Sequence, residues 1–178
     1  MTESIDLHSK IRTIPHFPKQ GVMFKDITTL LLDPSAFQHA VNEMIKPFIG
    51  KKIDKVVAAE SRGFIFGSVI AHKLNAGFVP LRKPGKLPYK TIKQEFETEY
   101  STDAFEMHED AIEKGDKVLM VDDLIATGGT LEAAVKLVEK LGGEVVGITT
   151  LIELTFLNGR EKLKGYDVYS VIKYDKEE

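Results

Sequence analysis

The sequence lacks cysteine, and this absence excludes several kinds of functional site at once. Disulfide bonds, thiolate nucleophiles and cysteine-based zinc or iron–sulfur centres cannot form in this chain. The sequence also lacks an excess of positive charge, since 27 acidic and 24 basic residues give a formal net charge of −3. That balance argues against a dedicated nucleic-acid binder, because such proteins usually carry a strongly basic face.

Long hydrophobic runs are missing as well. Unbroken apolar stretches reach about five residues, far short of the ~20 that a membrane helix needs. No basic region followed by an apolar core is visible at the N-terminus, so we expect no signal peptide. With 43% hydrophobic and 29% charged residues, the composition is typical of a soluble globular protein. We expect a cytoplasmic protein of one domain, residues 1–178, with no nucleic-acid or membrane partner.

Short apolar runs alternate with amphipathic patterns along most of the chain. Buried strands are predicted at residues 54–60, 78–81, 117–121, 145–152 and 168–173, and helices from Pro34, at 64–74 and at 130–141. Asp33 can cap the first of these helices. Such an alternation indicates an α/β domain built on a parallel sheet. Residues 1–30 show no clear period, and we expect irregular structure there with one short helix at 4–13.

One connection carries an unusual distribution of charge. Residues 82–93 contain five basic side chains and no acidic one, whereas residues 95–113 contain eight acidic side chains and no Lys or Arg. Long connections inside compact domains are usually functional and often close over an active site. On the charge pattern alone, a solvated hairpin is slightly favoured over such a lid.

The stretch Val118–Thr130 carries the strongest chemical signal. It runs from the end of a predicted parallel strand into a helix, where α/β sheets place their ligands. Gly128 and Gly129 allow close approach to a ligand, and the first N–H groups of the helix would form an anion cradle with hydroxyls from Thr127 and Thr130. A phosphate group is the natural occupant of such a cradle.

The acidic pair Asp122-Asp123 stands directly before this cradle. Neither of the common nucleotide fingerprints, G-x-x-x-x-G-K-[ST] or G-x-G-x-x-G, is present. Two carboxylates beside a phosphate site indicate that they grip another part of the same ligand, either ribose hydroxyls or a magnesium ion held jointly with it. A strand-end turn with capping Asp and Thr residues is the structural alternative, and the full motif disfavours it.

Residues 121–130 resemble the phosphoribosyl pyrophosphate (PRPP) motif of the type I phosphoribosyltransferases. Over residues 5–175 the chain is similar to the adenine-specific members of that family. The resemblance also rests on residues 17–27, 61–64, 82–88, 153–160 and the pair Glu99-Tyr100. It implies the type I fold: a central, mainly parallel sheet flanked by helices, a small N-terminal hood (mainly residues 1–30) and a flexible catalytic loop region (residues 82–113).

The same resemblance implies a reaction in purine salvage, in which adenine and PRPP form AMP and pyrophosphate. Alternatives are a phosphoribosyltransferase for another purine base, or a PRPP-sensing regulator that binds nucleic acid. Mg²⁺ would arrive with the diphosphate, so no metal site built by the protein alone is expected. A homodimer is expected, with at least one basic residue reaching across the interface.

Roles for individual residues also follow from the resemblance. The 5-phosphate would be held by Ala126, Thr127, Gly128, Gly129 and Thr130, and the PRPP or AMP ribose by Asp122 and Asp123. Pyrophosphate would be bound by Ser61, Arg62, Arg82, Lys83 and Lys86, with a non-proline cis peptide at Glu60–Ser61. At position 60 the family more often has aspartate.

Two further groups complete the expected site. Met23, Phe24 and Lys25, largely through backbone groups, would enclose adenine together with Leu157. Glu99 and Tyr100 would belong to the closing loop, with Glu99 as the proton donor to the base. Together with Asp122 and Asp123, which would steady the developing positive charge, these two residues form the expected catalytic set.

Overall fold

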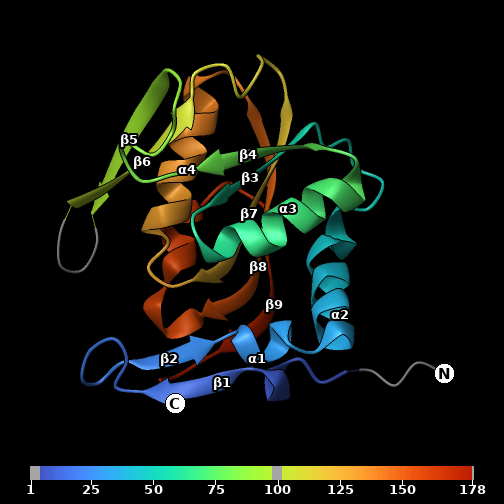
Figure 1. Ribbon diagram of the computed structural model, residues 1–178, viewed down its shortest axis with the longest axis vertical. Helices are drawn as coiled ribbons and strands as arrows, with labels where there is room; N and C mark the ends of the chain where they lie inside the picture. Colours follow the sequence, from blue (N-terminus) through green and yellow to red (C-terminus); the bar gives the residue numbers. More distant parts are fainter. Residues whose placement is uncertain (1–4, 98–101, 178) are drawn as a thin grey trace.

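A five-stranded parallel sheet forms the centre of the molecule in the computed structural model, which describes residues 5–97 and 102–177 (Figure 1). The strand order is β4 (Gly77–Leu81), β3 (Lys55–Ala59), β7 (Lys117–Ile125), β8 (Glu144–Leu154) and β9 (Val168–Tyr174). Every neighbouring pair in this sheet is parallel. The predicted parallel α/β architecture and all five predicted strands are therefore confirmed.

Helices cover both faces of this sheet, so the core has two halves. On one face α2 (Pro34–Ile45) and α3 (Arg62–Leu74) pack against β3, β7 and β8. On the other face α4 (Gly129–Lys140) packs against the same strands. The predicted cap of α2 is confirmed, since the Asp33 carboxylate accepts the N–H groups of Ser35 and Ala36 at 3.0 and 3.1 Å. The 3₁₀ turn η2 (Lys46–Phe48) follows α2.

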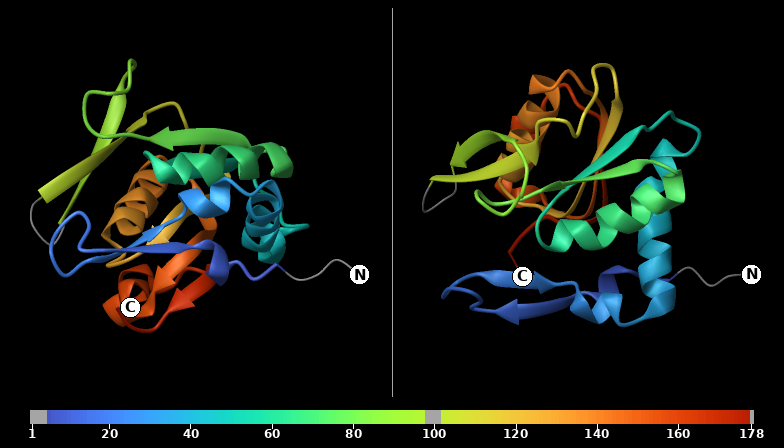
Figure 2. Two further views of the ribbon diagram at one scale, coloured as in Figure 1. Left: turned by 60° about the horizontal axis from the view of Figure 1, so that its bottom comes forward. Right: turned by 45° about the horizontal axis from the view of Figure 1, so that its top comes forward.

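The N-terminal residues form a small two-stranded hood. Strands β1 (Arg12–Pro15) and β2 (Met23–Asp26) pair antiparallel, preceded by the 3₁₀ turn η1 (His8–Lys10) and followed by the short helix α1 (Thr28–Leu31). The expectation of irregular structure with a helix at 4–13 is therefore wrong. Ile14 and Phe24 face each other in this pairing, and such a contact is invisible to a search for local periodicity. In the right-hand view of Figure 2 the hood lies at the bottom of the molecule.

The charged connection folds as a hairpin that rests on α4. Strands β5 (Thr91–Glu97) and β6 (Thr102–His108) pair antiparallel. The rings of Phe96 and Phe105 stack with centroids 5.1 Å apart, and Lys140 of α4 donates to the Gln94 amide oxygen at 2.8 Å. The hairpin expected from the charge pattern is confirmed. Glu99 and Tyr100 lie outside the described residues.

Strand β7 is longer than the sequence predicts. It was expected to end at Val121 and to continue as a loop, but it stays paired with β8 as far as Ile125, opposite Glu153. Asp122 and Asp123 consequently lie on a central strand, because ladder hydrogen bonds to β8 hold the backbone in spite of the polar side chains. The last 3₁₀ turns are η3 (Thr155–Leu157) and η4 (Gly159–Leu163). Within the described ranges, no helix is both long and apolar enough to cross a bilayer.

Candidate active site

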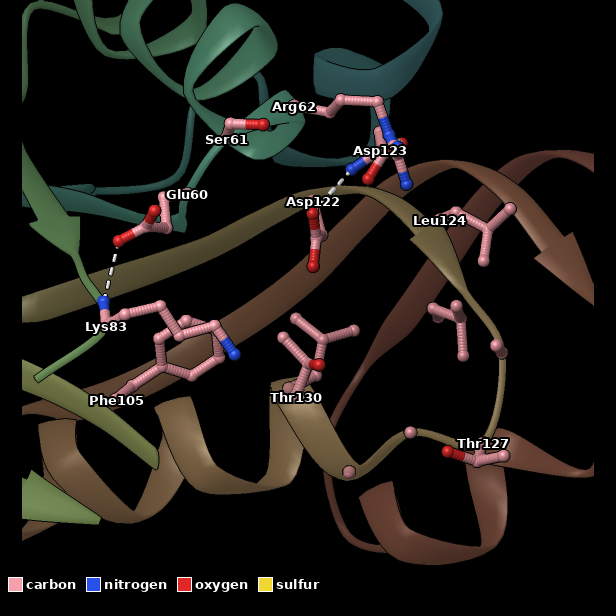
Figure 3. A pocket seen from close by; sticks show the side chains of 15 residues that line it. Glu60, Ser61, Arg62, Lys83, Phe105, Asp122, Asp123, Leu124, Thr127 and Thr130 are labelled. Atoms are coloured by element: carbon pink, nitrogen blue, oxygen red, sulfur yellow. Dashed lines mark hydrogen bonds and ion pairs between the residues drawn. The ribbon is translucent and has the colours of Figure 1, made fainter. Parts of the chain in front are cut away.

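A polar cavity opens at the carboxyl ends of β3 and β7. From β3 the chain continues to β4 on one side of the sheet, and from β7 it continues to β8 on the other side, so the strand order reverses between β3 and β7. Open α/β sheets bind their ligands at such a point. The cavity has a volume of about 370 Å³. Its lining comprises Glu60, Ser61, Arg62, Lys83, Phe105 and residues 122–131 (Figure 3). The structure thus brings together segments from β3, the charged hairpin and the β7–α4 connection.

The β7–α4 connection supplies the expected anion cradle. Gly128 adopts φ +81°, a left-handed conformation that favours glycine, and α4 begins at the next residue. The unpaired N–H groups of the first helical turn and the positive end of the helix dipole therefore face the cavity. All five residues predicted to hold a phosphate, 126 to 130, line it.

The two aspartates of β7 differ in their partners. The Asp123 carboxylate accepts Arg62 Nε at 2.5 Å, whereas Asp122 Oδ1 accepts the Asp123 N–H at 2.9 Å. Figure 3 shows the Asp122 side chain pointing into the cavity toward the side where Thr130 lies. Burial, together with the negative charge of Asp123, raises the pKa of Asp122 well above its ordinary value. Asp122 is therefore a buried carboxyl group on whose pKa the nearby cation Arg62 has a smaller effect than burial and Asp123.

The β3–α3 turn places Ser61 and Arg62 at the opposite wall. The Glu60–Ser61 peptide bond is cis, as the sequence resemblance implied. Arg62 bridges two parts of the molecule, because its guanidinium carbon also lies 5.2 Å from the centroid of the Phe24 ring in the hood.

The basic residues after β4 are held by two carboxylates. Glu60 accepts hydrogen bonds from Arg82 Nε at 3.2 Å, from Lys86 Nζ at 2.6 Å and from the Lys83 N–H at 2.6 Å. Burial opposes ionisation of Glu60, but these three bonds outweigh it and lower its pKa to about 2. The Lys83 ammonium forms an ion pair with Asp103 of β6. Only Lys83 of the three basic side chains lines the cavity.

Known proteins that resemble this chain identify its family. Residues 29–177 match the family model of the phosphoribosyl transferase domain. An adenine phosphoribosyltransferase of Acetivibrio thermocellus is 57% identical over 171 residues, which are 96% of this chain and 100% of the relative. One from Christiangramia forsetii is 58% identical over 96% of this chain and 99% of its own length. The chain belongs to the adenine phosphoribosyltransferases.

Solved structures of the same family agree with this assignment. The enzyme of Thermoanaerobacter pseudethanolicus superposes with a TM-score of 0.92 at 53% identity, covering 94% of this chain and 98% of that one. The Saccharomyces cerevisiae enzyme, in complex with an imino-altritol bisphosphate and adenine, has a TM-score of 0.88 at 40% identity, covering 93% and 96%. The type I fold expected from the sequence is confirmed. This phosphoribosyltransferase is a pentosyltransferase that forms AMP and pyrophosphate from adenine and PRPP.

The residues expected to enclose adenine lie outside the cavity described above. Met23, Phe24 and Lys25 follow one another on β2, and Leu157 lies on η3; none of them lines it. The Lys25 side chain is buried, donates to Thr13 Oγ1 at 3.0 Å and lies over the Tyr174 ring, so only its backbone is available to a base.

Sequence reasoning missed two further participants. Phe105 lines the cavity. It was missed because it stands in the acidic stretch 95–113, where the charge pattern gave no sign of an apolar side chain at the site. Glu60 was singled out only for its peptide bond, but its carboxylate organises the basic cluster. Neither could be found from local patterns, because both contacts join separate segments of the chain.

Proposed function

We propose that this cavity is where PRPP is bound and cleaved, with its 5-phosphate on residues 126–130. One observation carries the assignment: a helix N-terminus that suits a phosphate and a buried pair of aspartates share one cavity. Several converging N–H groups can bind a charged phosphate without a lysine, since each such hydrogen bond contributes about 1.5–3 kcal/mol.

Asp122 and Asp123 act on the ribose in this proposal. Their carboxylates lie between the anion cradle and Arg62, the position of a sugar whose 5-phosphate occupies the cradle. Carboxylates accept hydrogen bonds from sugar hydroxyls. Transfer of the ribosyl group develops positive charge on the sugar ring, and a negative side chain that needs no reorganisation stabilises such a transition state.

Pyrophosphate leaves toward Ser61, Arg62 and Lys83. Arg82 and Lys86 also bind the diphosphate of PRPP, once it replaces the Glu60 carboxylate as their partner. The resulting cations neutralise the charge that develops on the leaving group.

Mg²⁺ fits this donor set when it arrives with the diphosphate. Across the described residues, no cluster of three or more His, Asp or Glu side chains could hold a metal ion. The buried carboxyl of Asp122 nevertheless offers the hard oxygen ligand that Mg²⁺ prefers, and substrate oxygens would complete the coordination. When bound, the ion would neutralise part of the diphosphate charge.

Adenine is placed between the hood and η3, against Arg62. One observation supports this position: the guanidinium carbon of Arg62 lies 5.2 Å from the centroid of the Phe24 ring in the hood. Backbone carbonyls at Met23 to Lys25 would accept the 6-amino group of adenine. Side chains there cannot read the base, since Met23 and Phe24 are apolar.

The hairpin β5–β6 forms the lid of a single domain that also includes the hood. Phe105 already brings this hairpin to the cavity wall. Glu99 and Tyr100, which lie outside the described residues, keep their proposed catalytic roles. A cytoplasmic homodimer is part of the proposal. Arg82, Lys83 and Lys86 exceed what one diphosphate needs from one chain, which favours a residue that acts across the interface.

A coupled assay of pyrophosphate release, with adenine, hypoxanthine, guanine and xanthine in parallel, tests the proposed base pocket. A 6-oxopurine would place its carbonyl against backbone carbonyls, and each buried unpaired acceptor costs about 1–3 kcal/mol. Sites of this kind reject the wrong analogue by roughly 10⁴-fold. Comparable kcat/KM values for adenine and hypoxanthine would contradict the carbonyl-lined pocket.

A further inference from the structure

The turn η4 lies directly beneath the residues that hold the phosphate, and the reaction as described gives it no role. Gly159 is buried, and a Cβ atom there would lie 2.3 Å from the carbonyl oxygen of Ala126 and 3.0 Å from the Gly128 nitrogen. A Cβ on Gly128 would in turn lie 2.3 Å from the carbonyl oxygen of Gly159. The two backbones are therefore in direct contact, so the position of residue 159 sets the position of residues 126–128.

Arg160, the next residue, is fixed by three hydrogen bonds. Its Nε and Nη2 atoms donate to the two carboxylate oxygens of Glu153 at 2.6 and 2.7 Å, and Nη1 donates to the Val168 carbonyl at 2.8 Å. Glu153 is only 4% exposed. The hydrogen bonds from Arg160 lower the pKa of the Glu153 carboxyl, so this buried partner stays ionised. Two-pronged pairing of this kind fixes orientation as well as distance.

Glu153 occupies a particular place in the sheet. It pairs in register with Ile125, the last residue of β7 before the phosphate-binding residues begin. A Cβ on Gly159 would also lie 2.7 Å from Ile125 Cγ2. Through Glu153, Arg160 therefore holds the backbone of residue 159 next to the Ile125–Glu153 pair of the sheet. Residues 126–130 begin directly after Ile125.

We propose that Arg160 is a positioning residue for the 5-phosphate, which holds the Gly159 backbone against residues 126–128 so that their N–H groups point at the phosphate. This inference rests on the proposed function of that cradle. Arg160 is not expected to touch substrate itself, since it does not line the cavity. A lysine would keep the charge but could not reproduce the planar fork or the third bond.

Calorimetric titration of two ligands that each occupy one half of the PRPP site tests the proposal. Ribose 5-phosphate reports on the cradle, and pyrophosphate reports on Ser61, Arg62 and Lys83. Arg160→Gln and Arg160→Lys are compared with Lys164→Met, which removes the exposed ion pair between Lys164 and Glu161 on the same turn. Each protein is titrated at a temperature at which it is fully folded, and Arg160→Lys carries the test if Arg160→Gln does not fold.

We expect Arg160→Gln to weaken the binding of ribose 5-phosphate by about tenfold or more, because small displacements of a binding group have large effects. Arg160→Lys should lose less affinity for this ligand. Pyrophosphate binding should change by less than about threefold, and Lys164→Met should affect neither ligand. Equal weakening of both ligands in the Arg160 variants would overturn the proposal, because it would show general damage. No weakening of ribose 5-phosphate would overturn it too.

Failure of the cradle assignment would look different. The wild-type protein would then fail to bind ribose 5-phosphate in competition with AMP, and the positioning role of Arg160 would be refuted together with the assignment. Loss confined to the Arg160 variants, in a wild-type background that binds ribose 5-phosphate, supports both.

Discussion

Substituting Gly128 by alanine adds one methyl group at the point where two backbones touch. The new Cβ would lie 2.3 Å from the Gly159 carbonyl oxygen, and a separation below 3.0 Å essentially never occurs for real Cβ atoms. The backbone must therefore move by at least about 0.7 Å, in a segment whose N–H groups face the cavity. The substitution also forces alanine into a left-handed conformation, φ +81°.

Two other glycines separate these effects. Gly50→Ala introduces the same strain, at φ +83°, with nothing within 4 Å of the new Cβ. Gly159→Ala introduces the collision, 2.3 Å from the Ala126 carbonyl oxygen, without a positive φ. The strain alone costs about 1–2 kcal/mol, and each kcal/mol lowers the Tm of a domain of this size by about 2–4 °C.

The readouts are the thermal unfolding midpoint and the steady-state rate with PRPP as the varied substrate. Gly50→Ala should lower the Tm and leave kcat/KM unchanged. Gly128→Ala and Gly159→Ala should both reduce kcat/KM for PRPP by about 100-fold, since a displacement approaching 1 Å has effects of this size. A Gly128→Ala enzyme with wild-type kcat/KM would refute the reasoning that this contact sets the geometry of the cradle.

Four further predictions concern charged side chains of the site. Asp122→Asn combined with Asp123→Asn should fold but lose several orders of magnitude in kcat/KM, and near wild-type activity would contradict the assigned roles. Because the pKa of Asp122 is raised on folding, wild-type stability should fall as the pH rises above about 4, and Asp122→Asn should have the higher Tm at pH 8. The pKa of Glu60 is lowered to about 2, so the ionised carboxylate stabilises the folded state above about pH 4.5, and this stabilisation is lost as the pH falls toward 2. In denaturant titrations, the free energy of unfolding of Glu60→Gln should therefore fall less steeply with acidification than that of the wild type. Mixing inactive Lys83→Ala and Asp122→Asn proteins should restore part of the activity if Lys83 acts across a dimer interface, and no recovery after confirmed subunit exchange would exclude that.

The parallel sheet could be predicted because each buried strand carries its own signal. Residues 118–121 are all apolar and a recognisable helix start follows a few residues later, so neither the place nor the type of this strand depends on remote partners. The end of that strand was wrong by four residues, because Asp122 to Ile125 are held by pairing with β8, which overrides their local preference.

The hood and the basic cluster could not be predicted for the same physical reason. Strands of four residues are too short to show alternation, and the partner that stabilises Arg12 is Asp26, at 2.6 Å across the hairpin. The helix α3 and the strand β4 separate Glu60 from Lys86 in the sequence, but a carboxylate oxygen of Glu60 lies 2.6 Å from Lys86 Nζ. Contacts between distant segments depend on how the helices and strands pack together, and the local sequence pattern carries no information about that packing.

The attachment of the hood has a consequence for the order in which the chain can assemble. Lys25 lies 4.1 Å from the centroid of the Tyr174 ring, and the His8 ring lies 4.7 Å from the same ring. Tyr174 ends the last strand of the sheet. The hood, which the ribosome makes early, is therefore anchored by a residue that is made near the end of synthesis. At about 5–20 residues per second, roughly 7–30 s of synthesis separates Lys25 from Tyr174. During that interval the hood lacks its contacts with Tyr174, and a chain cut before β9 would lose both this anchor of the hood and the Val168 carbonyl that accepts Arg160.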